Sequence, residues 1–215
     1  MNAEHEKKRV EYAEKIIKDN HPFNRTVFTD EKKFNLDGPD NWSSWTDPNR
    51  KLLRQKRQMG GGGVMTWGMI TPDGECIVKK MEGRIDSTGY QKTIEEPLNY
   101  LDTKYGRGGY WFQQDNAAIH TSRSTSKYFE DRNVKLLKHS ARSPDLNPME
   151  NAWKVLSDEV YENRQYRDKQ SLWESIDNSA KKVTNEKSDK VKGLFAGMRS
   201  RLLKVIKGKG KSTNE

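Results

Sequence analysis

The sequence predicts an α/β protein in which a mixed β-sheet is flanked by helices. Three observations support this fold class. Short runs rich in β-branched and aromatic residues come first, strand and helix patterns then alternate, and helical patterns close the chain. This order of elements is typical of a mixed sheet with helices packed on its faces.

The first part of the chain contains one helix and most of the strands. Residues 3–19 show a charged helical pattern whose apolar face carries Val10, Ala13 and Ile17. Strands are expected at 26–30, 33–36, 64–70 and 76–82. The third of these is the clearest, because the turn sequence Thr71-Pro72-Asp73-Gly74 follows it.

Strands and helices alternate in the middle of the chain. A helical face is formed by Tyr90, Ile94, Leu98 and Leu101. Pro97 lies within this helix and is expected to kink or interrupt it. A strand at 110–114, a helix at 119–132 and a strand at 134–138 follow.

Helical patterns close the chain. The helix that starts at Pro148 has one apolar face, formed by Met149, Trp153, Leu156 and Val160, which is expected to pack on the sheet. Two further helices carry the apolar residues Leu172, Ile176 and Ala180, and Val191, Leu194, Phe195, Met198 and Leu202.

Composition fits a single domain over residues 1–215. Forty Lys and Arg against 31 Asp and Glu give a net charge of +9. Such a surface attracts phosphate backbones, but charge alone fits a basic protein without a nucleic-acid partner equally well. The hydrophobic fraction of 32% indicates that part of the chain is exposed loop or tail.

Other composition features exclude several classes of site. The single cysteine, Cys76, excludes an internal disulfide and fits a small core residue in a strand. Four scattered His without a Cys-x-x-Cys pair do not indicate a zinc site. No apolar stretch reaches bilayer length, and a charged segment rather than a signal peptide follows Met1, so no membrane partner is expected.

Three acidic residues stand out by their positions. Asp30 and Asp115 each close a short apolar or aromatic run, and Glu150 opens a helix 34 residues (116 to 149) after Asp115. Carboxylates from two strand ends and one helix start can converge into a cup of oxygen atoms, which suits Mg²⁺ or Mn²⁺. Two ions in such a cup can activate an attacking oxygen and stabilise the leaving oxygen of a phosphodiester. The pattern therefore indicates phosphoryl transfer on nucleic acid.

Each acid also has a purely structural interpretation. An Asp at a strand end commonly serves as a turn or cap residue. If Asn147 caps the helix and Pro148 is its first residue, Glu150 occupies the capping-box position. Asp145 is a weaker ligand candidate and is better explained as a turn residue.

The residues around the acids favour the catalytic interpretation. The relevant segments are Thr29-Asp30-Glu31-Lys32-Lys33-Phe34, Gly60 to Gly63 before Val64-Met65-Thr66-Trp67-Gly68, Gln113-Gln114-Asp115-Asn116-Ala117-Ala118-Ile119-His120, and 143–153. In this order and at this spacing they closely resemble the catalytic core of mariner-like transposases. The match is to the branch with Asp, Asp and Glu and 34 residues between the last two, and it extends from about Arg9 to the closing segment 201–207.

This resemblance implies a fold, an activity and partners. It implies an RNase H-like fold, a pair of Mg²⁺ or Mn²⁺ ions held by Asp30, Asp115 and Glu150, and a nuclear protein. The activity is cleavage of double-stranded DNA at transposon ends, followed by joining of the 3′-hydroxyl to a TA dinucleotide in target DNA, in a homodimeric complex. Members of the family carry two helix-turn-helix modules before the core, so we expect this chain to have the chemistry without the main reader of DNA sequence.

Two basic segments and three polar residues complete the set of candidates. The segment 41–58, with Arg50, Lys51, Arg54, Lys56 and Arg57, is either a solvated loop or, as the resemblance implies, a clamp-like hairpin that reaches DNA and the partner subunit. The tail 199–215, with Arg199, Arg201 and Lys204, is either a frayed end or a phosphate-contacting or nuclear-import element. Asn116 and His120 follow Asp115 into a helix start, where backbone N–H groups favour phosphate. His120 could hydrogen-bond a DNA phosphate or a metal-bound water, or equally be a helix-start residue with a structural partner. Asn151 could orient a metal-bound water.

Two other functions remain open. An RNase H-like nuclease would share the three acids without needing the basic segment or the helical C-terminal extension. A truncated or domesticated DNA-binding regulator could keep the fold and antagonise full-length transposases by mixed dimerisation. The presence of all three acids argues against the second.

Overall fold

A computed structural model describes residues 2–39, 62–83, 85–140, 143–162 and 165–213. The predicted segment 41–58 and its five basic residues, Arg50, Lys51, Arg54, Lys56 and Arg57, lie outside the described residues. In the described part of the chain, no helix is long and apolar enough to span a membrane.

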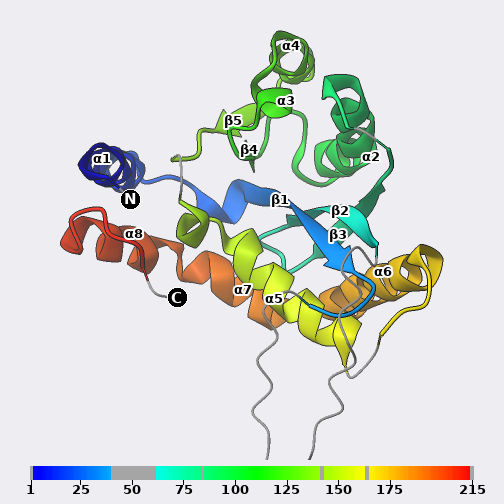
Figure 1. Ribbon diagram of the computed structural model, residues 1–215. Coiled ribbons are helices and arrows are strands. Elements are labelled where there is room, and N and C mark those ends of the chain that lie inside the picture. Colours follow the sequence, from blue (N-terminus) through cyan, green and yellow to red (C-terminus); the bar gives the residue numbers. More distant parts are fainter. Residues whose placement is uncertain (1, 40–61, 84, 141–142, 163–164, 214–215) are drawn as a thin grey trace, which may run out of the picture.

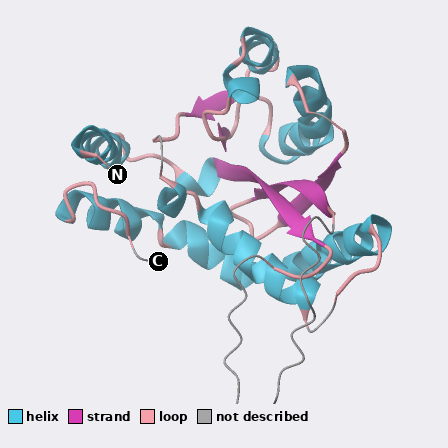
Figure 2. Ribbon diagram, viewed as in Figure 1, coloured by secondary structure: helices cyan, strands magenta, loops and turns pink. Residues whose placement is uncertain are grey.

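A five-stranded mixed sheet forms the centre of the protein (Figures 1 and 2). Its strands are β1 (Thr26–Asn35), β2 (Gly63–Ile70), β3 (Cys76–Met81), β4 (Trp111–Gln113) and β5 (Lys135–Leu137), in the order β3-β2-β1-β4-β5. The pairs β1–β2 and β2–β3 are antiparallel, whereas β1–β4 and β4–β5 are parallel. The predicted mixed sheet flanked by helices is confirmed.

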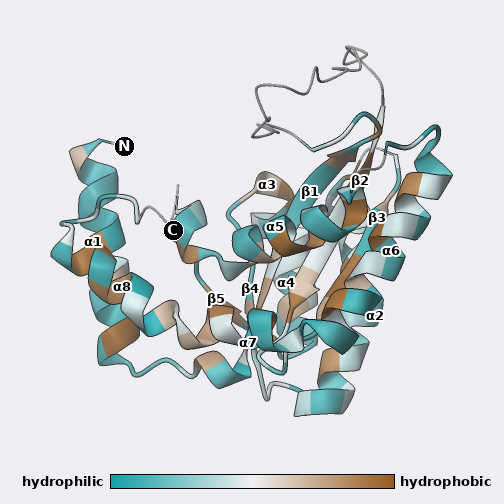
Figure 3. Cartoon of the chain, turned by 90° about the horizontal axis from the view of Figure 1, so that it is seen from below, coloured by the Kyte–Doolittle hydropathy of each residue, from teal (hydrophilic) through white to brown (hydrophobic). Residues whose placement is uncertain are grey.

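Helices cover both faces of the sheet (Figure 1). One face carries α2 (Ser87–Tyr105), α3 (Ala118–Thr121) and α4 (Arg123–Asp131), and the other carries α5 (Pro148–Tyr161), α6 (Lys169–Glu186) and α7 (Ser188–Ala196). Alternation along β1 separates the two cores, because Val27 packs with the α2 side and Phe28 with the α5 side. Hydrophobic and hydrophilic bands alternate along the helices in Figure 3, as amphipathic packing requires.

A third, smaller layer joins the two ends of the described chain. Helix α1 (Ala3–Lys18) lies beside α8 (Met198–Lys207) in both views (Figures 1 and 3). Arg9, fully buried, makes two hydrogen bonds to Asp145, at 2.8 and 2.6 Å, and a third to the carbonyl of Gly210. Thr213 donates its backbone N–H to Asp145 at 2.8 Å. The segment from 199 to 213 is therefore folded and not a frayed end.

Several predicted boundaries need correction. The strands predicted at 26–30 and 33–36 form one continuous strand, because the pairing of β1 with β2 continues through Glu31 and Lys32. The predicted helix 119–132 is broken at Ser122, whose backbone is extended and whose hydroxyl caps α4 by accepting from Thr125 N–H. Three helices, α6 to α8, replace the two predicted at the C-terminal end.

Two helix predictions also differ in detail. Helix α2 runs through Pro97 without interruption, since its apolar face is fully buried in the core. The buried stripe of α1 contains Arg9, Ala13 and Ile16 in place of the predicted Val10, Ala13 and Ile17. The hydrogen bonds of Arg9 to Asp145 and Gly210 hold the helix in this rotation. The apolar stripe predicted for α5 is buried as expected.

Candidate active site

Asp30 lies in the middle of β1, on the face covered by α5, and not at a strand end as predicted. Its partner across the antiparallel pair is Gly68 in β2. A β-carbon at Gly68 would stand 2.4 Å from the indole of Trp153 and 2.5 Å from the terminal methyl of Met149. The glycine thus lets α5 approach the sheet closely, and the Trp153 indole N–H donates to Oδ2 of Asp30 at 3.0 Å.

The start of α5 is fixed to the strand that carries Asp30. Asn147 caps the helix, because its side-chain oxygen accepts the N–H of Met149 at 3.1 Å. The other end of the same amide donates to the carbonyl of Thr29 at 3.1 Å. Glu150, in the first turn between these anchors, is exposed. The backbone N–H of Asn147 binds Pro144, so the capping-box interpretation does not explain Glu150.

Glu150, at the start of α5, lies close enough to Asp30 for the two charges to repel. Burial raises the pKa of Asp30 to about 7, and repulsion from Glu150 adds to this against the opposing effect of the Trp153 hydrogen bond. Ionised Asp30 is therefore destabilised by its surroundings. A cation beside Asp30 and Glu150 would remove that penalty, so the residues fit an oxygen-coordinated divalent ion.

Asp115 follows the end of β4, which runs parallel to β1 with Phe28 opposite Gln113. Extending that register by two residues brings Asp115 level with Asp30. Its Oδ1 accepts the N–H of Ala117 at 2.9 Å and contacts Nδ1 of His120 at 2.6 Å. The His120 hydrogen bond lowers the pKa of Asp115, with burial opposing it.

His120 is buried between two carboxylates. Its Nε2 lies 3.2 Å from Oε1 of Glu31, an ion-pair distance without hydrogen-bond alignment. The centroid of its ring lies 4.2 Å from that of Tyr90, and the two rings are tilted by 39°. Burial alone would lower the pKa of His120, but Asp115 and Glu31 together raise it to about 9. His120 thus lies between Asp115 and Glu31 as a partner of both within the fold. A contact of His120 with a DNA phosphate or a metal-bound water stays a prediction.

The predicted convergence of all three acids is not present. Among the residues that the structure describes, no three His, Cys, Asp or Glu side chains are close enough to hold one metal ion. Asp30 and Glu150 lie together, whereas Asp115 is turned to His120. Mutual repulsion of carboxylates accounts for this, because Asp115 finds a positive partner elsewhere. The role of the three acids as metal ligands stays a prediction.

The structure places the other predicted polar residues of the site in different surroundings. Asn116 is exposed and its side-chain amide donates to the carbonyl of His139 at 3.1 Å. Asn151 is partly buried beside Glu150. Asp145 is bound by Arg9 and Thr213, which confirms that it is a structural turn residue.

The basic residues of α8 do not form one exposed set. Arg199 and Lys204 are exposed, but Arg201 is buried, and the prediction that it contacts DNA is wrong for this arrangement. Its side chain lies on the face of α8 that packs inward, together with Leu202 and Val205.

Two residues of the site are not apparent from the sequence pattern alone. Trp153 is predicted there only as part of the apolar stripe, although an indole one turn after Glu150 carries a donor that needs a partner when buried. Glu31 has no predicted role. Its position directly after Asp30 in a strand places it on the opposite face, which strand periodicity alone could have indicated.

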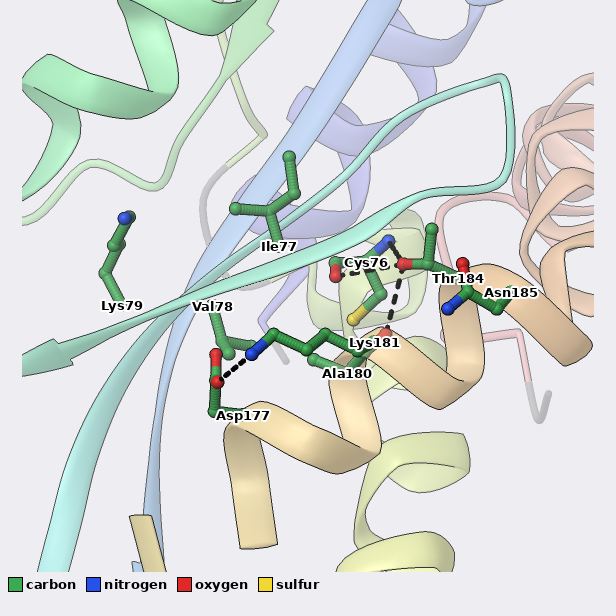
Figure 4. Close-up of a pocket in the computed structure, with 9 residues that line it drawn as sticks. All are labelled: Cys76, Ile77, Val78, Lys79, Asp177, Ala180, Lys181, Thr184 and Asn185. Carbon is green, nitrogen blue, oxygen red and sulfur yellow. Dashed lines mark hydrogen bonds and ion pairs between the residues drawn. The ribbon is translucent and has the colours of Figure 1, made fainter. Parts of the chain in front are cut away.

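A pocket of about 280 Å³ lies elsewhere, between β3 and α6 (Figure 4). Thr184 accepts the N–H of Cys76 at 3.0 Å, and Lys181 pairs with Asp177 at 2.6 Å. Cys76 is buried, and burial raises the pKa of its thiol to about 12, so it is a core residue as predicted. The pocket contains none of the three acids.

Solved structures with the same fold are transposases. The chain superposes on the Mos1 transposase paired-end complex with left transposon end with a TM-score of 0.83, at 20% identity over 99% of this chain and 64% of that one. It also matches the catalytic domain of Mos1 mariner transposase with a TM-score of 0.74, at 18% identity over 100% of this chain and 98% of that one. The fold is therefore that of an RNase H-like catalytic domain.

Comparison of sequences identifies the family to which the chain belongs. The model of the DDE superfamily endonuclease family matches residues 25–173, and the chain belongs to this family. It is 38% identical over 217 residues to the transposable element Tc3 transposase of Caenorhabditis elegans, covering 100% of this chain and 64% of that protein. It is 32% identical to the transposable element Tcb2 transposase of Caenorhabditis briggsae, over 70% of this chain and 59% of that protein. The chain thus spans about two thirds of the length of the relatives it matches.

Proposed function

We propose that the chain is the catalytic domain of a DNA transposase, which cleaves phosphodiester bonds at transposon ends and joins the 3′-hydroxyl to target DNA. Family membership supports the class of enzyme. The observation that carries the proposal is the double attachment of α5 to β1. Asn147 binds the carbonyl of Thr29 and Trp153 binds Asp30, so the first turn of α5, which carries Glu150, is held against the strand that carries Asp30.

Asp30, Asp115 and Glu150 would hold two Mg²⁺ or Mn²⁺ ions. Relatives of the same fold include structures described as Mos1 complexes with Mg and with Mn. When bound, such ions supply Lewis-acid stabilisation of the reacting phosphate and increase the acidity of water. The donor set fits, because it consists of carboxylate oxygens and one of these carboxylates is destabilised as an isolated anion.

The residues of this chain orient the ligands. Trp153 fixes Oδ2 of Asp30 and leaves the other oxygen for a ligand. Glu150 is exposed in the first turn of α5, where a negative charge is favoured by the helix dipole. Oδ1 of Asp115 is held in the same way, because it contacts both the backbone N–H of Ala117 and the ring of His120.

DNA and a second copy of the chain are the proposed partners. The neighbours of the same fold include a paired-end complex, a pre-cleavage transpososome and a strand transfer complex of Mos1. We extend to this chain a homodimeric complex on transposon-end DNA, a TA target and a nuclear location. Arg50, Lys51, Arg54, Lys56 and Arg57, with the exposed Arg199 and Lys204, are the proposed phosphate contacts.

A second candidate is a non-enzymatic DNA-binding regulator. The observation that favours it is the position of Asp115, which binds His120 and does not join Asp30 and Glu150. Such a protein would bind DNA through the same basic residues and would cut none.

Cleavage of a plasmid carrying transposon ends distinguishes the two. The chain should nick it with Mg²⁺ or Mn²⁺ and not with Ca²⁺. Asp30→Asn and Glu150→Gln should each abolish nicking while keeping DNA affinity, and Glu96→Gln, which neutralises an exposed acid on α2, should behave as wild type. DNA binding without nicking by the wild-type chain would favour the regulator.

A further inference from the structure

Glu31 is adjacent to Asp30 in β1 but its side chain lies on the other face of the sheet. Asp30 contacts Trp153 of α5, whereas Glu31 contacts His120 of α3, on the side covered by α2. Only 15% of the Glu31 side chain is exposed. Among the residues that the structure describes, the charged partner of this largely buried carboxylate is His120, which also contacts Asp115.

His120 is held firmly between Glu31 and Asp115. Its Nδ1 lies 2.6 Å from Oδ1 of Asp115, its Nε2 lies 3.2 Å from Oε1 of Glu31, and its ring rests on Tyr90. Gln114 connects Tyr90 with His120. Its side-chain oxygen accepts a hydrogen bond from the Tyr90 hydroxyl at 2.6 Å, and its side-chain nitrogen donates to the carbonyl of His120 at 3.2 Å. The imidazole ring therefore contacts both carboxylates, and its placement beside Asp115 depends on its contact with Glu31.

Asp115 has one oxygen fixed and the other free. Both of its hydrogen bonds, to Ala117 and to His120, use Oδ1. Within the described residues Oδ2 accepts no hydrogen bond, and the Asp115 side chain is 51% exposed. An acid held in this way presents its second oxygen in one direction, as metal-binding carboxylates with an outer hydrogen-bond partner do.

We propose that Glu31 is a positioning residue for Asp115, acting through His120, and that it sets the direction in which Oδ2 of Asp115 meets a divalent cation. This proposal rests on the proposed metal site. It assigns Glu31 no direct bond to the cation, because Glu31 lies on the opposite face of the strand from Asp30.

A competing explanation is that Glu31 acts only through its negative charge. A pair of variants, Glu31→Gln and Glu31→Met, distinguishes the positioning role from a role of charge alone. Both remove the charge and keep the length of the side chain, but only glutamine keeps a side-chain oxygen where Oε1 of Glu31 lies 3.2 Å from Nε2 of His120. The readout is Mn²⁺ affinity of the full chain, measured by titration with electron paramagnetic resonance detection of free Mn²⁺. Cooperative thermal unfolding checks that each variant is folded.

The proposal predicts that Glu31→Met binds Mn²⁺ at least about tenfold more weakly than Glu31→Gln, since loss of an outer-sphere partner costs about 10- to 100-fold in affinity. The exposed Glu96 provides the control pair, and Glu96→Gln and Glu96→Met should bind alike. In a His120→Ala background the difference between Glu31→Gln and Glu31→Met should vanish. Equal affinities of the two Glu31 variants, or a difference that persists without His120, would overturn the positioning role.

A second measurement does not depend on any variant. A structure of the wild-type chain with Mn²⁺ should keep His120 between Glu31 and Asp115 while Oδ2 of Asp115 binds the ion. Departure of Asp115 from His120 on metal binding would overturn the proposal and leave the metal site intact. A wild-type chain that binds no Mn²⁺ would contradict the proposed function itself, and the positioning role with it.

Discussion

The indole N–H of Trp153 donates to Oδ2 of Asp30 at 3.0 Å and thereby links α5 to β1. The strand residue and the helix residue are 123 positions apart in the chain. This one hydrogen bond aligns the helix that carries Glu150 with the strand that carries Asp30. It also opposes the rise in the pKa of Asp30, because it stabilises the ionised carboxylate.

Replacement of Trp153 by Phe should therefore remove the hydrogen bond to Asp30 while keeping most of the packing of the core. Phenylalanine keeps most of the apolar packing against Gly68 and removes the donor. We expect a loss of about 1–2 kcal/mol in the free energy of unfolding and a further increase in the pKa of Asp30. Urea unfolding and carboxyl ¹³C chemical shifts measure the two effects. Trp173→Phe, at a partly exposed position of α6, is the matched control, and an unchanged Asp30 titration in Trp153→Phe would contradict the assigned bond.

Gly68→Ala should displace α5 from the sheet. The added methyl would meet the ring of Trp153 at 2.4 Å, and such overpacking costs about 1–3 kcal/mol. The control is Gly193→Ala in α7, where a β-carbon meets nothing within 4 Å. That substitution should stabilise the chain by about 0.5–1 kcal/mol, because alanine is the better helix former. Urea unfolding of both variants gives the comparison, and equal effects would show that the close approach at Gly68 is not needed.

Stability should depend on pH through Asp30. The pKa of Asp30 is raised to about 7, whereas an unfolded Asp titrates near about 3.9, so the native state holds this proton to a higher pH. The contribution to stability is complete below about pH 4 and is lost as the pH rises through about 7. Asp30→Asn cannot ionise, and in EDTA it should gain roughly 1–3 kcal/mol over wild type at about pH 8.

Divalent metal should reverse the difference in stability between Asp30→Asn and the wild-type chain. Mg²⁺ should raise the melting temperature of wild type at about pH 8 more than at about pH 5.5, and it should have little effect on Asp30→Asn. A wild-type chain whose stability is the same at both pH values in EDTA would show that Asp30 is not destabilised as an anion.

Arg9→Met should be among the most damaging substitutions outside the site. It leaves the Asp145 carboxylate, 7% exposed, without its bidentate partner, and breaking such a buried pair costs about 3–5 kcal/mol. Lys8→Met breaks an exposed pair with Glu4 on the same helix and should cost less than about 0.5 kcal/mol. Urea unfolding distinguishes the two. Similar losses would mean that the Arg9–Asp145 pair is dispensable.

DNA binding is expected to be salt-sensitive and nearly blind to sequence. Neutralising Arg54, Lys56 and Arg57 together should lower the affinities for transposon-end DNA and for a random duplex in parallel. The slope of log affinity against log salt should decrease by up to about 2.7, since each phosphate that the protein no longer neutralises accounts for about 0.9. Titrations of both duplexes at two salt concentrations test this. A preference of about tenfold for the transposon end, about 1.4 kcal/mol, would show that this domain reads sequence itself.

Periodicity in the sequence predicts the helices of this fold better than its polar contacts. The stripe of Met149, Trp153, Leu156 and Val160 is buried as expected, because an amphipathic helix has one way to cover a sheet. The polar run from Asp30 to Lys33 obscured the continuity of β1. Its backbone is paired with β2 throughout this run, which outweighs the lack of apolar side chains.

Side-chain partners across the fold could not be predicted from local pattern. Motif spacing identified Asp115, but its contact with His120 and the position of Glu31 depend on the pairing of β1 with β4 and on the break at Ser122. The charge of Arg201 suggested a DNA contact, whereas packing of α8 buries it. In both cases tertiary packing, which a single sequence does not display, decided the outcome.

The buried guanidinium of Arg9 sets an order of events in folding. Its bonds to Asp145 and Gly210 span 136 and 201 positions, and Thr213 reaches Asp145 across 68. Contacts of such long range form late, after loop closure has been completed elsewhere. The turn before Pro148 therefore has all of its long-range partners only when Arg9, Gly210 and Thr213 are in place together. The loop that leads into α5 therefore depends for its order on residues far from it in the chain, at positions 9, 210 and 213.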